Sequence, residues 1–253
     1  MTSMLDNPNL SNLSVILGVA EKAAIADYRW RERGRSPIGY VKGMALVYAR
    51  VHCKFKRGEK GAVAMARAES TENATDALTW YRDLFNEAEM SNASSGIGTL
   101  RHLFVLLIGL GMRESAGKYC AGRDDNARRK NPDTVEAGLF QASYDLRTAS
   151  PLLTSLLERY NGSTDFLDVF KEGVRCADVD HINYGQGEAY NFQKLSKSCP
   201  AFAAEFAAIG LRHKRKHWGP ISNRRAEIRH ECDSMLRAVE RVVDDGDLCS
   251  FLI

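Results

Sequence analysis

The sequence predicts a mostly α-helical protein built around one buried central helix, with at most a small β-hairpin. Apolar residues recur at helical spacing along most of the chain, and almost no segment alternates apolar and polar residues as a half-buried strand does. The stretch TLRHLFVLLIGLG, residues 99–111, is apolar on all sides, which is typical of a helix inside a domain. With 253 residues, 44% of them hydrophobic, the chain is long enough to bury a sizeable core.

Four helices are expected before the central one. The first begins with a Ser/Asn capping signal, and the second follows a turn marked by proline and glycine. The fourth repeats apolar residues at helical spacing. We expect these helices in residues 11–30, 37–56, 62–70 and 73–90.

The segment SNASSGIG then interrupts the helical pattern, which predicts an N-terminal helical region over 1–95 and a second domain over 96–253. The central helix starts near Thr99 and is expected to end at the glycine pair Gly109 and Gly111. A small hairpin fits between residues 119 and 144. Further helices are expected in 149–160, 165–176, 191–218 and 221–243.

The sequence carries no signal for several common classes of protein. The 35 Lys and Arg nearly balance the 32 Asp and Glu, so the net charge of +3 does not by itself indicate nucleic-acid binding. The longest apolar run, 103–110, is far shorter than the roughly 20 residues of a membrane-spanning helix. The first residues lack a basic start and a convincing cleavage site, so no signal peptide is expected.

The six cysteines are scattered without C-x-x-C spacing, and we therefore expect neither a zinc site nor another cofactor. Six cysteines can form disulfides in 15 ways, and buried reduced thiols are an equally good interpretation. The positions are 53, 120, 176, 199, 232 and 249.

A basic cluster lies in the segment RHKRKHWGPISNRR, residues 212–225. It could attract an anionic polymer, either cell wall or nucleic acid. No recognition-helix or base-stacking motif accompanies it, so a solvated basic face is the favoured interpretation and nucleic acid is not an expected partner.

Glu114 follows the apolar central helix directly. A carboxylate there loses solvation, which raises its pKa and lets it stay protonated near neutral pH, as a general acid must. The alternative is an ordinary ion pair with Arg113 or Arg123 at the helix end.

Two segments around this position form a pattern. RESAGK, residues 113–118, is followed by AGLFQAS, residues 137–143. Together they resemble the two signature segments of the goose-type lysozymes and soluble lytic transglycosylases. The resemblance covers roughly residues 98–150 and implies a lysozyme-like helical domain over 96–253. It implies that Glu114 is the catalytic acid, that Ser115 is its neighbour in the cleft, and that Gln141 lies on the facing wall.

Hydrolysis of a glycosidic bond usually needs a second carboxylate. Carboxyl groups about 6.5–9.5 Å apart leave room for an activated water, whereas about 5–5.5 Å permits direct attack. Asp124 and Asp125 lie in the loop after Glu114, where goose-type enzymes carry a water-orienting Asp, and Asp145 follows Gln141. Asp124 ranks above Asp145, and an ordinary loop acid is the alternative at each position. Lytic transglycosylases work with one acid, so these additional acids favour hydrolysis.

Three aromatic residues are further candidates for contact with sugar. Phe140 and Tyr144 could stack on sugar faces, and core packing is an equal alternative. Tyr190, in EAYNFQ, is similar to the Ala-Tyr-Asn wall segment of transglycosylases, although the glycine that follows there is missing here.

These observations predict a muramidase that cuts peptidoglycan between N-acetylmuramic acid and N-acetylglucosamine. Alternatives are a lytic transglycosylase, a chitinase-like glycosidase, and a cell-wall-binding module without turnover. Its partner would be peptidoglycan, in the periplasm or outside the cell. Without an export signal, we expect delivery by a non-classical route, as for an antibacterial toxin with an immunity protein, or a lysin domain of a longer chain.

Overall fold

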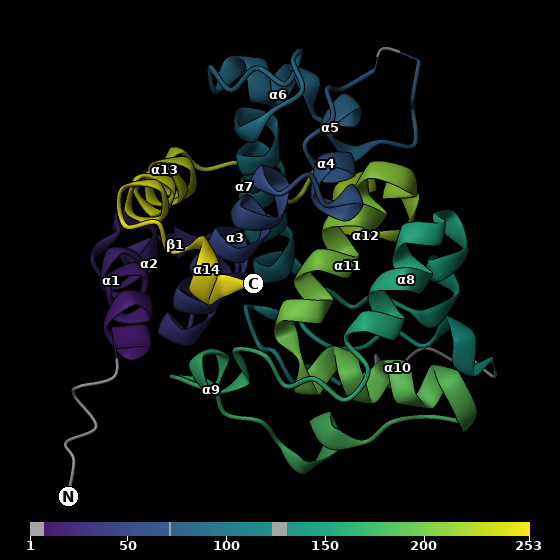
Figure 1. Ribbon diagram of the computed structural model, residues 1–253. Helices are drawn as coiled ribbons and strands as arrows, with labels where there is room; N and C mark the ends of the chain where they lie inside the picture. The colour runs from purple at the N-terminus through teal and green to yellow at the C-terminus, as the bar shows by residue number, and fades with distance from the viewer. Residues whose placement is uncertain (1–7, 71, 123–130) are drawn as a thin grey trace, which may run out of the picture.

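The structure, a computed structural model, describes residues 8–70, 72–122 and 131–253. It is mostly helical, which confirms the predicted class (Figure 1). The longer helices are α1 (Pro8–Lys22), α3 (Ile38–Lys56), α7 (Ile97–Ser115), α8 (Pro151–Arg159), α10 (Gly187–Ser198), α11 (Pro200–His213) and α13 (His230–Asp245).

Shorter elements connect these helices. The short α-helices are α2 (Ala24–Asp27), α4 (Lys60–Met65), α5 (Ala77–Trp80), α6 (Arg82–Glu87), α9 (Leu167–Phe170), α12 (Gly219–Ser222) and α14 (Cys249–Leu252). The 3-10 turns are η2 (Pro132–Thr134), η3 (Tyr144–Ala149), η4 (Asp178–His181) and η5 (Arg215–His217). The strands are β1 (Arg29–Trp30) and β2 (Gly34–Arg35).

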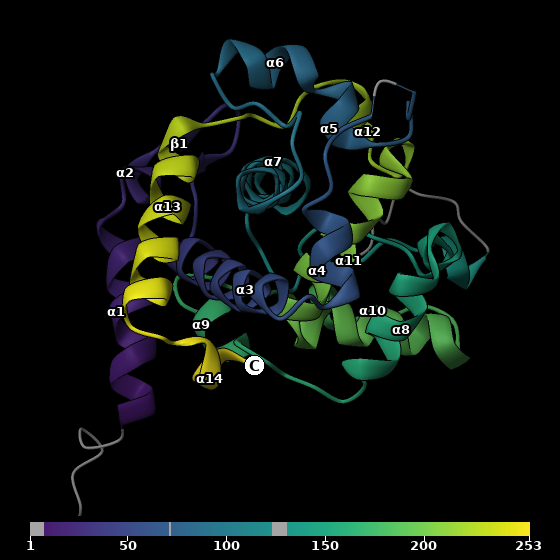
Figure 2. The same cartoon turned by 45° about the horizontal axis from the view of Figure 1, so that its top comes forward.

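Helix α7 is the central element, as predicted. Figure 2 shows it nearly end-on in the middle of the molecule, with α3, α11 and α13 around it. Every residue of α7 from Thr99 to Met112 is buried. An apolar surface on all sides of this helix is therefore matched by partners on all sides.

The predicted end of α7 at its two glycines is wrong, because the helix continues to Ser115. Both glycines instead permit close packing. A Cβ at Gly109 would lie 2.2 Å from the carbonyl oxygen of Glu227, and one at Gly111 would lie 2.4 Å from the Tyr40 hydroxyl oxygen. The helix ends one turn later, where Ala116 adopts the left-handed conformation with φ of 54°.

The small hairpin lies elsewhere than predicted. Strands β1 and β2 pair antiparallel, with Arg29 opposite Arg35, inside and just beyond the first predicted helix. Their tight turn has positive φ at Glu32 and Gly34. Among the described residues of 119–144, the pairing is a single bridge between Ala137 and Ala142.

One hydrophobic core extends through the described residues and does not divide near residue 95. It includes α3 from the first predicted region and both α7 and α11 from the second. A buried ion pair also links the two regions, because Lys54 Nζ on α3 lies 2.8 Å from the Glu205 carboxylate on α11. The Tyr160 hydroxyl donates to the same carboxylate at 2.7 Å.

Four of the six cysteines form disulfides, Cys53–Cys249 and Cys120–Cys176. Cys199 and Cys232 are buried free thiols. None of the helices in the described residues has both the length and the apolar character that crossing a bilayer requires.

Candidate active site

The last turn of α7 opens into a cavity of about 510 Å³. Glu114 and Ser115 from the first predicted motif line this cavity, and so does Gln141 from the second. The sequence motifs therefore meet in space, as the resemblance implies. The cavity is completed by Arg33, Ala116, Lys118, Ala121, Gly122, Val179 and Asp180.

Gln141 is held in place by its own turn. Its Nε2 donates to the Gly138 carbonyl oxygen at 2.9 Å, and its backbone has a positive φ of 47°. Gly138 N donates to the Ala121 carbonyl oxygen at 2.9 Å, which ties the turn to the chain beyond α7. A Cβ at Gly138 would lie 2.6 Å from the Ser196 carbonyl oxygen, so this close approach requires glycine.

The Glu114 carboxyl has a strongly raised pKa. Its pKa is raised to about 8: burial is the largest cause, the nearby charge of Glu136 acts in the same direction, and Arg33 and Arg113 act against it. The carboxyl is therefore largely protonated at neutral pH, which is the state that a general acid needs.

The ion pair between Glu114 and Arg113 that sequence offered as an alternative does not form. Arg113 instead pairs with Glu32 at 2.9 Å, and its carbonyl oxygen accepts from the Arg33 guanidinium at 2.6 Å. Within the described part of the chain, no hydrogen bond or ion pair engages the Glu114 carboxyl. Arg123, the other proposed partner, lies outside the described residues.

Sequence reasoning missed Glu136. This residue immediately precedes the Ala137–Ala142 bridge and is partly buried. Its charge reaches Glu114 because the turn that positions Gln141 also brings this part of the chain to the end of α7. A carboxylate adjoining the second motif was the available signal.

One wall of the cavity is fastened covalently and electrostatically. The Cys120–Cys176 disulfide joins it to the chain after α7, and Lys118 forms an ion pair with Asp180. Although burial raises the pKa of Asp180, the hydrogen bond from Lys118 holds it below its ordinary value overall. Asp180 is thus an ionised structural carboxylate rather than a proton donor.

Of the candidates for a second acid, Asp145 belongs to the described residues, and it does not line this cavity. Asp124 and Asp125 lie outside the described residues. Asp145 accepts a hydrogen bond from the Ser143 hydroxyl at the start of η3 and is not among the residues that line the cavity.

The aromatic candidates for sugar contact do not line the cavity of Glu114 either. Phe140 was a candidate for contact with sugar, with core packing as the equal alternative. Its side chain is 1% exposed in the core, and its carbonyl oxygen accepts from Trp218 Nε1 at 2.8 Å. Tyr144 is 5% exposed, and its hydroxyl donates to Glu188. Core packing therefore accounts for both rings.

Tyr190 is 37% exposed and lines a different cavity of about 420 Å³. The two cavities lie along the same pair of segments, since Tyr119 and His181 line this one while Lys118 and Asp180 line that of Glu114. Tyr190 therefore lines a cavity that adjoins that of Glu114 along the chain, and it does not line the cavity of Glu114 itself.

Part of the basic cluster packs onto the protein itself. The Arg215 guanidinium lies 3.9 Å from the ring centroid of Trp80 and donates to the Ala74 carbonyl oxygen. Arg224 pairs with Asp83 at 2.6 Å. Among the described residues, no three His, Cys, Asp or Glu side chains lie together as they would to hold a metal ion.

No protein-family model, curated protein or solved structure matches the chain.

Proposed function

We propose that this protein is a muramidase, which hydrolyses the glycan strand of peptidoglycan between N-acetylmuramic acid and N-acetylglucosamine. The observation that carries the proposal is the meeting of Glu114 and Gln141 on one cavity, where the Glu114 carboxyl has a pKa of about 8. An open cavity beside a protonated carboxyl gives a glycosidic oxygen access to a proton donor.

Glu114 would act first, by donating its proton to the oxygen of the leaving sugar. Because no described side chain is hydrogen-bonded to this carboxyl, it is available to the substrate. The leaving sugar then departs as an alcohol, and positive charge develops at the anomeric carbon of the other sugar. The deprotonated Glu114 lies near this charge and stabilises it.

Gln141 would orient the sugar rather than transfer a proton. Its Nε2 is already used by the Gly138 carbonyl oxygen, which leaves its amide oxygen as an acceptor. The acetamido N–H of an N-acetylated sugar is a suitable donor for it. This contact favours N-acetylated glycans as the substrate class.

Hydrolysis further requires a base that activates water. Asp124 remains the first candidate from the sequence. Glu136 is the candidate that the structure adds, because its charge already acts on Glu114. The site would then resemble a pair of carboxyl groups with different pKa values, one acid and one base.

A lytic transglycosylase is the second candidate, and one observation favours it. Among the described residues that line the cavity, the carboxylate other than Glu114 is Asp180, and that group is already paired with Lys118. A single available acid suits a reaction in which the sugar's own acetamido group assists. Products with anhydro-sugar ends would identify this reaction.

Both disulfides suit a protein that works outside the reducing cytosol, where peptidoglycan lies. A delivered toxin with an immunity partner, or a lysin, fits this setting.

The proposal is tested by adding the purified protein to purified cell walls and following their clearing. We expect clearing by the native protein and none by a folded Glu114→Gln variant. Binding without clearing by the native protein would instead identify a non-catalytic wall-binding module.

A further inference from the structure

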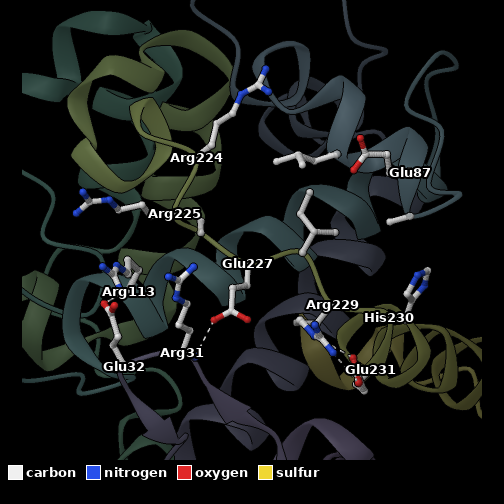
Figure 3. A pocket seen from close by; sticks show the side chains of 14 residues that line it. Arg31, Glu32, Glu87, Arg113, Arg224, Arg225, Glu227, Arg229, His230 and Glu231 are labelled. Atoms are coloured by element: carbon white, nitrogen blue, oxygen red, sulfur yellow. Dashed lines mark hydrogen bonds and ion pairs between the residues drawn. The ribbon is translucent and has the colours of Figure 1, made fainter.

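A further cavity, of about 700 Å³, shares the hairpin turn with the cavity of Glu114: Arg31 and Glu32 line it, and Arg33 lines the cavity of Glu114. Its walls come from the turn between β1 and β2, the ends of α6 and α7, and the segment 224–231 that leads into α13. Figure 3 shows the arginine and glutamate side chains that line it from these elements.

Most of these side chains already have an ion-pair or hydrogen-bond partner within the protein. Arg113 pairs with Glu32, and Arg229 pairs with Glu231 at 3.1 Å. The Glu227 carboxylate accepts one hydrogen bond from the Tyr28 hydroxyl and another from Arg31 N, each of 2.9 Å. These groups build the wall and are not free to bind a ligand.

Arg31 and Arg225 differ from the others. In the described ranges, neither guanidinium donates a hydrogen bond or forms an ion pair, and both side chains are exposed. Figure 3 shows both near the Arg113–Glu32 pair, whereas Glu87 lies toward the opposite end of the cavity. The pKa of Glu32 is lowered first by Arg113 and further by the charges of Arg31 and Arg225. Arg113 and Glu32 cancel each other, and the Glu227 carboxylate, whose hydrogen bonds come from uncharged donors, offsets only one of the two further guanidinium charges. This end of the cavity therefore keeps a net positive charge.

The backbone that carries Arg225 is firmly positioned. Arg225 N donates to the Pro220 carbonyl oxygen at 2.7 Å, and Ala226 N donates to the Tyr81 hydroxyl at 3.3 Å. The neighbouring Glu227 carbonyl packs against Gly109 of α7. A guanidinium on such a support loses less freedom on binding than one on a mobile loop.

We propose that Arg31 and Arg225 bind carboxylate groups of the polymer whose glycan strand is cut beside Glu114, so that this cavity selects the stem peptides of peptidoglycan. The inference rests on the proposed function. Guanidinium groups bind carboxylates through paired, charge-assisted hydrogen bonds. Chitin has no carboxylate, so this site would favour peptidoglycan over chitin.

The two cavities are close enough along the chain to serve one extended ligand. Arg113 lines the arginine-rich cavity and Glu114, the next residue, lines the other. Within the hairpin turn, Arg31 and Glu32 line the arginine-rich cavity, and Arg33 lines the cavity of Glu114. A polymer that passes over this turn would place sugar beside Glu114 and its peptide beside Arg31 and Arg225.

The test measures binding without turnover. The Glu114→Gln protein is sedimented with insoluble peptidoglycan, freed of teichoic acid, over a range of salt concentrations. In the same background, Arg31→Gln with Arg225→Gln should weaken binding by about tenfold or more and reduce its salt dependence, because charge-assisted hydrogen bonds are lost. The control, Arg67→Gln with Arg241→Gln, removes two exposed arginines outside both cavities and should change neither quantity.

A second arm identifies the anion. Coupling the stem-peptide carboxylates to methylamine with a carbodiimide removes their charge and leaves the polymer insoluble, and it should weaken binding of the parent protein to the level of the Arg31/Arg225 variant. If this treatment has no effect, or if both arginine pairs behave alike, the inference is overturned. Should wall clearing by the native protein persist in that case, the proposed muramidase activity stands alone. Arginine-dependent binding without clearing would instead support stem-peptide binding by this cavity and remove the proposed activity.

Discussion

At the residue scale, Glu114 shows how position changes the chemistry of a common side chain. The same carboxyl on a solvated surface would be ionised at neutral pH. Here the apolar helix beneath it and the loss of solvent raise its pKa to about 8, despite two nearby arginines. One of those arginines is already paired with Glu32, which limits its effect.

This pKa predicts the pH dependence of activity. Glu114 must be protonated to donate, so kcat/KM on soluble glycan fragments should fall as pH rises through about 8. The protonated fraction, and with it the activity, is retained below that pH until another group titrates. A descending limb near the ordinary pKa of a glutamate, about 4.3, would contradict this assignment.

Glu136 should tune that limb. Replacing it in Glu136→Gln removes a negative charge that favours the neutral form of Glu114, so the descending limb should move to lower pH. The measurement is the same pH profile. Glu158→Gln serves as control, because this exposed residue on α8 lies outside the cavity. An unchanged limb in Glu136→Gln would remove Glu136 from the site.

The sequence could predict that three candidate residues come together because each lies in a short motif. Glu114, Ser115 and Gln141 meet on one cavity as expected. Phe140 could not be assigned in the same way, since a motif does not reveal which side of a turn faces the core. Glu136 adjoins the second motif, but it was missed because its nearness to Glu114 depends on the path of the chain between the two segments, which the motif alone does not indicate.

At the element scale, α7 was predicted as the buried centre but given the wrong end. Glycine often follows the last turn of a helix, so the pair at 109 and 111 suggested a stop. Packing decided otherwise, because the Glu227 backbone and the Tyr40 hydroxyl require room at these positions. The hairpin at 29–35 was missed because two-residue strands carry no measurable alternation.

Gly109→Ala tests this interpretation of α7. Its new methyl group would lie 2.2 Å from the Glu227 carbonyl oxygen, so the substitution should reduce the free energy of unfolding by about 1–3 kcal/mol or more. Gly98→Ala in the first turn of the same helix is the control. Its Cβ meets nothing closer than 4.0 Å, and alanine favours the helix, so stability should stay equal or rise. Chemical denaturation measures both; equal stability of the two variants would contradict the account.

At the scale of the whole molecule, the two predicted regions are parts of one packed structure. The sequence suggested a boundary because a polar, glycine-containing segment precedes α7. Such a segment also serves as an ordinary loop, and long-range contacts decide between the two. The disulfide pairing could not be predicted from the sequence either, since it depends on which segments pack together.

Glu205→Gln tests how strongly the two regions depend on each other. The buried Glu205 carboxylate holds Lys54 of α3, and its loss leaves that ammonium without its anion. The free energy of unfolding should fall by about 3–5 kcal/mol. Glu59→Gln breaks the exposed pair with Arg159 and should cost less than about 1 kcal/mol. Similar losses in both variants would mean that the buried pair does not join the regions.

The central claim is that the protein cuts the glycan strand of peptidoglycan with Glu114 as the acid. Mass spectrometry of the products released from purified peptidoglycan tests it most directly, with native protein and a folded Glu114→Gln variant side by side. We predict muropeptides with free reducing ends from the native protein and none from the variant. Anhydro-sugar ends would keep Glu114 but make the enzyme a transglycosylase. Release of no glycan products by the native protein, or equal release by the variant, would contradict the claim.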